Sequence, residues 1–204
     1  MGAVALLSGC GGGNKSHWTL GAEQKHKWGY YSGSPETRWD SDGRTMTLLN
    51  EFRYTDPKGE VWVAPAGSVV DGASIPRSLG TIMGGPFEGK YRNASVLHDV
   101  AYDNKNRPPK ECDLMFYNAC RCSGVSAVEA GTMYYSLIRF GNHWKFEVKR
   151  AKKVKNQSMT AQQAEEQYPK AIPVNQANVN AARNWIQDSN PSAEQIEQRA
   201  NAGR

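Results

Sequence analysis

The spacing of apolar residues predicts strands in the middle of the chain. Between Thr45 and Val70, apolar and polar residues partly alternate, as in strands that bury one face. The sequence "DPKGE" at 56–60 interrupts this pattern with a proline and a glycine, the residues that a tight turn favours. We therefore expect a β-hairpin in which "VWVAP" is the returning strand.

After residue 90 the apolar residues recur at three- and four-residue spacing, which predicts three helices at residues 91–105, 109–122 and 126–140. Ser126 and Glu129 have the spacing of a capping box at the start of the third helix. This helix is apolar around most of its circumference and should pack centrally. The expected fold class is α+β, with a small antiparallel β-hairpin sheet packed beside a three-helix core.

Composition divides the 204 residues into three parts around one core. Residues 1–36 are expected to be a signal and flexible tether, and residues 37–144 an α+β domain. Residues 145–204 are expected to be a basic segment and a polar, partly disordered tail. Within this tail, "NQANVNAARNWIQD" predicts one amphipathic helix, and the last fifteen or so residues are expected to be frayed.

The first ten residues, "MGAVALLSGC", resemble a bacterial lipobox followed by a glycine-rich tether. The resemblance implies that Cys10 carries the lipid and anchors the protein in the bacterial cell envelope, on the periplasmic side of a membrane. The alternative is a chance cysteine, since the apolar run is short and no basic residue precedes it. A transmembrane helix needs about 18 consecutive apolar residues. No stretch of the sequence approaches this length, so we expect the protein to be anchored by the lipid and not to span the membrane.

Basic residues exceed acidic ones by 25 to 20, and six of them lie in "KFEVKRAKKVK" at 145–155. This run favours contact with a membrane surface, where Lys149 and Arg150 would bind anionic phospholipid. A solvated linker without a ligand is an equal alternative. Nucleic acid is not expected as a partner, because few aromatic residues lie between the basic ones.

Three cysteines crowd one predicted helix. Cys112 and Cys120 would lie about 12 Å apart along it, which is too far for a disulfide. Cys122 completes no Cys-x-x-Cys pair, so a zinc site is not expected. We expect all three to be free thiols, buried on an apolar face.

Ionisable residues lie at the edges of two predicted helices. On a helical wheel, His98 and Tyr102 follow one edge of the apolar stripe, and Asp99 lies one row further out. We expect His98 to be half-buried and Asp99 to face a groove. Asp113 flanks the apolar stripe of the next helix, which should run antiparallel to the first because the connection is short.

This arrangement predicts that Asp113 accepts a hydrogen bond from the ring of His98 or from the hydroxyl of Tyr102. The other ring nitrogen of His98 would then take a proton from water, as a general base does. A purely structural cluster is an equal alternative. His143 has no comparable neighbours in the sequence, and no role is expected for it.

The pattern His98-Asp99-x-x-Tyr102, followed by "CDLMFYNAC", resembles the active-site helices of secreted and bacterial phospholipases A2 over residues 94–120. The resemblance implies that His98 is the catalytic base, that Asp99 binds Ca²⁺, and that Tyr102 and Asp113 support the histidine. The family's paired cysteines are absent, and no calcium loop is recognisable. The nearest candidate for that loop is "GGPFEGK", with the carbonyls of Gly84, Gly85 and Gly89.

A broader resemblance covers residues 61–144. The blocks "APAGSVVDGASIPRSL", "GKYRNASVLHDVAYD", "ECDLMF" and "MYYSLIRFGNHW" are similar, in this order, to the DUF1353 family of uncharacterised phage and bacterial proteins. The resemblance implies that these blocks form one unit and that the origin is a phage or prophage. It implies no activity.

Ser74 and two arginines are further candidates for a role in binding or catalysis. Ser74 lies in "DGASIPR", which predicts a turn and a helix cap rather than a nucleophile. Arg77 and Arg139 would bind a substrate phosphate or, as the favoured alternative, pair with Asp71 or Asp103.

The predicted function is a lipid-anchored envelope hydrolase, with Ca²⁺ as a candidate cofactor, in which the His-Asp pair activates water against a phospholipid ester. The alternative is a non-enzymatic phage or prophage envelope lipoprotein that binds a receptor or a cell-wall component, for example in superinfection exclusion.

Overall fold

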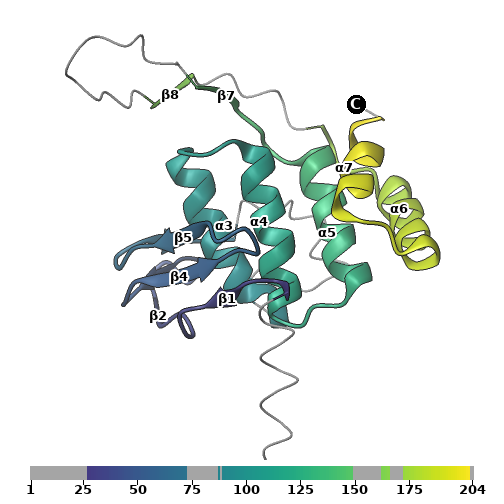
Figure 1. The fold of residues 1–204 in the computed structure, drawn as a ribbon. Coiled ribbons are helices and arrows are strands. Elements are labelled where there is room, and N and C mark those ends of the chain that lie inside the picture. Colours follow the sequence, from purple (N-terminus) through teal and green to yellow (C-terminus); the bar gives the residue numbers. More distant parts are fainter. Residues whose placement is uncertain (1–26, 73–86, 88, 149–161, 166–171, 203–204) are drawn as a thin grey trace, which may run out of the picture.

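The computed structural model describes residues 27–72, 87, 89–148, 162–165 and 172–202. The strands between residues 30 and 70 lie on one side of the helices at 92–104 and 109–122, and the helices at 176–189 and 193–201 lie beyond the helix at 127–140 on the other side (Figure 1). The helical elements are η2 (Gly89–Tyr91), α3 (Arg92–Asn104), α4 (Pro109–Cys122), α5 (Ala127–Phe140), α6 (Gln176–Ser189) and α7 (Ala193–Asn201). The strands are β1 (Tyr30–Tyr31), β2 (Thr37–Trp39), β3 (Met46–Leu48), β4 (Phe52–Thr55), β5 (Val61–Ala64), β6 (Val69–Val70), β7 (Lys145–Val148) and β8 (Gln162–Glu165). The expected α+β class is confirmed.

The strands before α3 form two small antiparallel sheets. The first has the order β1-β4-β5, and β4 and β5 are the predicted hairpin. Its turn is closed by the Asp56 carboxylate, which accepts the backbone N–H groups of Lys58 and Glu60. The second sheet has the order β2-β3-β6. The sequence pattern had placed β3 within the hairpin region, whereas the structure pairs it with strands on either side of that hairpin.

The three predicted helices are confirmed as α3, α4 and α5. Proline at the first position of α4 suits a helix start because its missing N–H would have no partner there. The Ser126 side chain accepts the N–H of Glu129 and caps α5. Nearly all of α5 is buried, as its apolar circumference predicted, because α4 covers one side and α6 and α7 the other.

The C-terminal helices extend the core beyond the predicted three helices. The structure forms α6 where one amphipathic helix was expected. The expected fraying is wrong for α7, which begins with a capping box between Ser192 and Gln195 and buries Ile196 against α5. A Cβ on Gly131 of α5 would come within 3.1 Å of Ile196 Cδ1, so the glycine permits this close approach. No helix among the described residues is long and apolar enough to cross a membrane.

Gly29 fixes the entry of the chain into the first sheet. Its φ of +82° favours glycine, and a Cβ there would lie 2.1 Å from the carbonyl oxygen of Thr55. Gly59 has a similar φ of +85°, but nothing lies within 4 Å of its Cβ position. We expect Gly29→Ala to lower the free energy of unfolding by roughly 3 kcal/mol, because backbone strain and a clash add together.

The matched variant Gly59→Ala should cost only about 1 kcal/mol, since it carries the strain without the clash. Urea denaturation of both variants measures the difference. Equal losses would show that the close approach of Gly29 to Thr55 adds nothing to stability.

Candidate site around Asp113

Asp113 of α4 is the centre of a buried polar cluster. His98 Nε2 lies 3.0 Å from Asp113 Oδ1, and the Tyr102 hydroxyl donates to the same oxygen at 2.6 Å. His143 Nε2 lies 2.9 Å from Asp113 Oδ2. The predicted contact of His98 and Tyr102 with Asp113 is therefore confirmed. We call these four residues the Asp113 cluster.

Helical spacing and aromatic packing hold the donors in place. His98 and Tyr102 are one helical turn apart on α3, and their ring centroids are 4.2 Å apart. The His98 ring also packs on Phe116 of α4 at 5.1 Å between centroids. On its other side, Tyr102 meets the edge of Trp144 at 5.0 Å. The two donors to Oδ1 thus have little freedom to turn away from the carboxylate.

The side chains of His98 and Asp113 have no exposed surface. The expectation of a half-buried His98 is therefore wrong, because α4 covers the edge of α3 that a single-helix wheel leaves open. Burial raises the pKa of Asp113, but the hydrogen bonds from His143 and His98 and the charge interactions with both rings together outweigh it and hold the pKa below the usual value. An ionised carboxylate only accepts hydrogen bonds, so both histidines donate from Nε2.

His143 is the member of the cluster that the sequence did not suggest. It follows α5 closely in the chain, and only the packing of α5 beside α4 brings it to Asp113. A Cβ on Gly141 would lie 2.4 Å from the carbonyl oxygen of Leu137 and 3.3 Å from His143 Nε2, so the glycine permits the close approach of the chain to the end of α5 just before His143. The one available signal was the position of His143 in the last block that resembles DUF1353.

Asp99 does not face a groove, contrary to expectation. It is only 4% exposed, and its Oδ2 accepts the backbone N–H of Gly72 at 2.6 Å. Gly72 comes shortly after β6, so this bond ties α3 to the second sheet. The wheel missed the contact because it leaves out the chain that lies over the helix.

The described residues around Asp99 do not make up a calcium site. Ca²⁺ takes six to eight oxygen ligands, whereas one oxygen of this single carboxylate already binds the Gly72 amide. In the part of the chain that the structure describes, no three His, Cys, Asp or Glu residues are grouped to hold a metal.

The structure describes only some of the other residues that the sequence analysis singled out. Arg139 donates to the carbonyl of Ala200 in α7, so its partner is neither Asp71 nor Asp103. The described cysteines form no disulfide, as expected, although Cys122 is only partly buried. The remaining site residues lie outside the described part of the chain, and these are Cys10, Ser74, Arg77, Gly84, Gly85, Lys149 and Arg150.

Comparison with known proteins confirms the broader resemblance. Residues 46–137 match the family model described as "Protein of unknown function (DUF1353)". This range contains His98, Asp99, Tyr102 and Asp113 and ends before His143. No solved structure gives a significant match.

Two relatives come from Sinorhizobium fredii (strain NBRC 101917 / NGR234). The uncharacterized protein y4jT is 38% identical over 130 residues, which are 63% of this chain and 39% of the relative. The uncharacterized protein y4iH is 34% identical over 103 residues, which are 50% of this chain and 43% of the relative. The matches thus span about two fifths of each relative's length, and neither name assigns an activity.

Proposed function

We propose that the DUF1353-like region of this chain, residues 46–137, is together with His143 a hydrolase in which His98 activates water against an ester. The observation that supports this is the Asp113 carboxylate, which receives hydrogen bonds from His98, Tyr102 and His143. A general base must be held in one orientation, and the imidazolium that it becomes needs a negative partner. Asp113 fixes the orientation of the His98 ring and supplies this negative partner.

The proposed reaction uses the two nitrogens of His98 differently. Nε2 donates to Asp113, so the proton of the attacking water goes to Nδ1. The hydroxide oxygen then bonds to the ester carbonyl carbon, and the bond from this carbon to the alcohol oxygen breaks. The proton returns from Nδ1 to the leaving alkoxide, which yields an acid and an alcohol. Throughout, Asp113 balances the positive charge on the ring.

The substrate class and the location of the protein complete the proposal. The phospholipase-like order of His98, Asp99 and Tyr102 favours a phospholipid ester. A lipid on Cys10 would hold the protein at a bacterial envelope membrane, and Lys149 and Arg150 would contact anionic headgroups. These parts rest on sequence resemblance and charge.

The full burial of His98 favours a second candidate function. Catalysis requires an opening that admits water and substrate to Nδ1, whereas a structural cluster requires none. In this second candidate the Asp113 cluster only stabilises the fold. The protein is then a non-enzymatic envelope lipoprotein of phage or prophage origin that binds a receptor or a cell-wall component.

Hydrolysis assays on the purified wild type and on His98→Gln test the first candidate. The substrates are 4-nitrophenyl esters of increasing acyl length and vesicles of phosphatidylglycerol, each with and without a chelator. Hydrolysis by the wild type that His98→Gln lacks would support the proposal. No hydrolysis by the wild type, or equal rates for both proteins, would refute it.

A cellular assay tests the second candidate. The chain is expressed in bacteria that are then challenged with phage. Protection that His98→Gln retains and Cys10→Ser loses would support the binding lipoprotein. Protection lost by His98→Gln in a folded protein would argue against it.

A further inference from the structure

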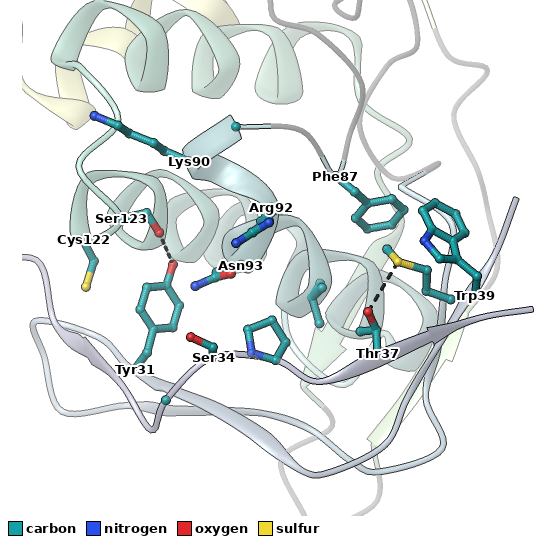
Figure 2. Close-up of a pocket in the computed structure, with 15 residues that line it drawn as sticks. Tyr31, Ser34, Thr37, Trp39, Phe87, Lys90, Arg92, Asn93, Cys122 and Ser123 are labelled. Atoms are coloured by element: carbon teal, nitrogen blue, oxygen red, sulfur yellow. Dashed lines mark hydrogen bonds between the residues drawn. The ribbon is translucent and has the colours of Figure 1, made fainter.

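A separate pocket lies between the strands near the N-terminal side and the start of α3. Its volume is about 860 Å³, which is within the range of sites for small molecules. Figure 2 shows Arg92 and Asn93 in the middle of the lining, Lys90 towards one end, and Phe87 and Trp39 together at the other. No member of the Asp113 cluster lines this pocket.

One part of the pocket carries two basic side chains, Lys90 of η2 and Arg92 of α3. The side chains of Lys90 and Arg92 are exposed, and neither forms an ion pair or a side-chain hydrogen bond within the described part of the chain. The first turns of η2 and α3 contain no acidic residue. The Arg92 guanidinium, with the amide of Asn93 beside it in Figure 2, suits the acceptor oxygens of a phosphate monoester, and Lys90, which extends away from Arg92, adds positive charge at one end of the pocket.

The other part of the pocket offers flat apolar surface. Trp39 is 61% exposed, although a side chain of its size usually packs against the core, and Phe87 lies beside it in Figure 2. Met46 forms the buried floor near them. Two aromatic faces at the mouth of a pocket are suited to stack on a planar ring.

The wall near the cations is fixed by hydrogen bonds. The Tyr31 hydroxyl donates to the carbonyl of Ala119 at 2.7 Å and lies 3.0 Å from Ser123 Oγ. These bonds hold the strand β1 against the end of α4. This wall of the pocket is therefore held in place without a ligand, which lowers the entropic cost of binding.

We propose that this pocket binds a soluble organic phosphate of nucleotide size. The phosphate lies at Arg92 and Asn93, and the planar ring lies against Trp39 and Phe87. The site is distinct from the Asp113 cluster, so the proposal does not depend on hydrolysis.

Isothermal titration calorimetry of the whole chain with AMP, adenosine and glycerol 3-phosphate tests this proposal. AMP should bind with a micromolar to millimolar Kd, and the two fragments should bind more weakly. Arg92→Gln should weaken AMP binding about tenfold, since a charged hydrogen bond is lost. Arg183→Gln, on the exposed surface of α6, is the matched control and should leave the Kd unchanged.

Trp39→Ala separates the two parts of the site. It should weaken the binding of AMP and leave that of glycerol 3-phosphate unchanged. Absence of AMP binding at millimolar concentration, or equal binding by Arg92→Gln and the wild type, would overturn the proposal. Glycerol 3-phosphate that binds as tightly as AMP would refute the role of Trp39 and Phe87.

Discussion

Replacing His98 with glutamine is expected to slow ester hydrolysis by roughly 10²- to 10⁴-fold, the usual contribution of a general base. The amide N–H of glutamine can still donate to Asp113, so the cluster keeps a hydrogen bond at this position. Glutamine cannot accept a proton at neutral pH, so only the chemical step is lost. The measurement is kcat/KM, with near-ultraviolet circular dichroism to show that the packing of the aromatic residues is retained.

His143→Gln is the matched control because it alters the other imidazole that donates to the same carboxylate. His143 binds the opposite oxygen and acts on the reaction only by positioning Asp113. Its replacement should therefore lower kcat/KM much less than His98→Gln does. Equal losses in the two variants would contradict the assignment of His98 as the base.

Asp113→Ala is expected to lower the free energy of unfolding by about 3–5 kcal/mol. The substitution leaves two imidazoles and a phenol without their acceptor inside the protein, and such groups are costly to bury unpaired. Urea denaturation measures the loss. Asp188→Ala, on the exposed surface of α6, should change stability by no more than about 0.5 kcal/mol.

The stability difference between the wild type and Asp113→Ala is also expected to depend on pH. The folded-state pKa of Asp113 is lowered, so its carboxylate contributes fully to stability above the unfolded pKa of about 3.9. This contribution is lost as the pH falls below that value and through the folded pKa. The difference in stability between the wild type and Asp113→Ala should therefore narrow in acid. A difference that stays constant from pH 7 to pH 3 would contradict this role for the carboxylate.

Local sequence patterns were enough to predict the helices and the central contact of the site. The periodicity of α3, α4 and α5 follows from the apolar face that each helix buries, and Pro109 and Ser126 mark two of their starts. The meeting of His98 with Asp113 followed from two helices joined by a short connection. In these cases the information lies within about 30 residues of chain.

Contacts between segments that are distant in the sequence could not be predicted from local sequence patterns. His143 reaches Asp113 only after α5 has packed beside α4, and β3 pairs with strands that flank the hairpin rather than form it. The burial of the His98 and Asp99 side chains depends on the segments that cover α3, and a helical wheel drawn for α3 alone does not include them. The packing of α7 likewise involves a residue far away in the sequence, Gly131 of α5, which lies close to Ile196.

His98 and Asp99 are neighbours in the chain, yet they bind different partners, Asp113 of α4 and the Gly72 amide near the second sheet. The order of the two residues is therefore fixed by the architecture. Exchanging them would set one carboxylate against another where neither has solvent, and would turn a bulky ring towards a backbone donor. A protein with these two residues exchanged would therefore lose the hydrogen bonds of both side chains at once, one to α4 and one to the segment after β6.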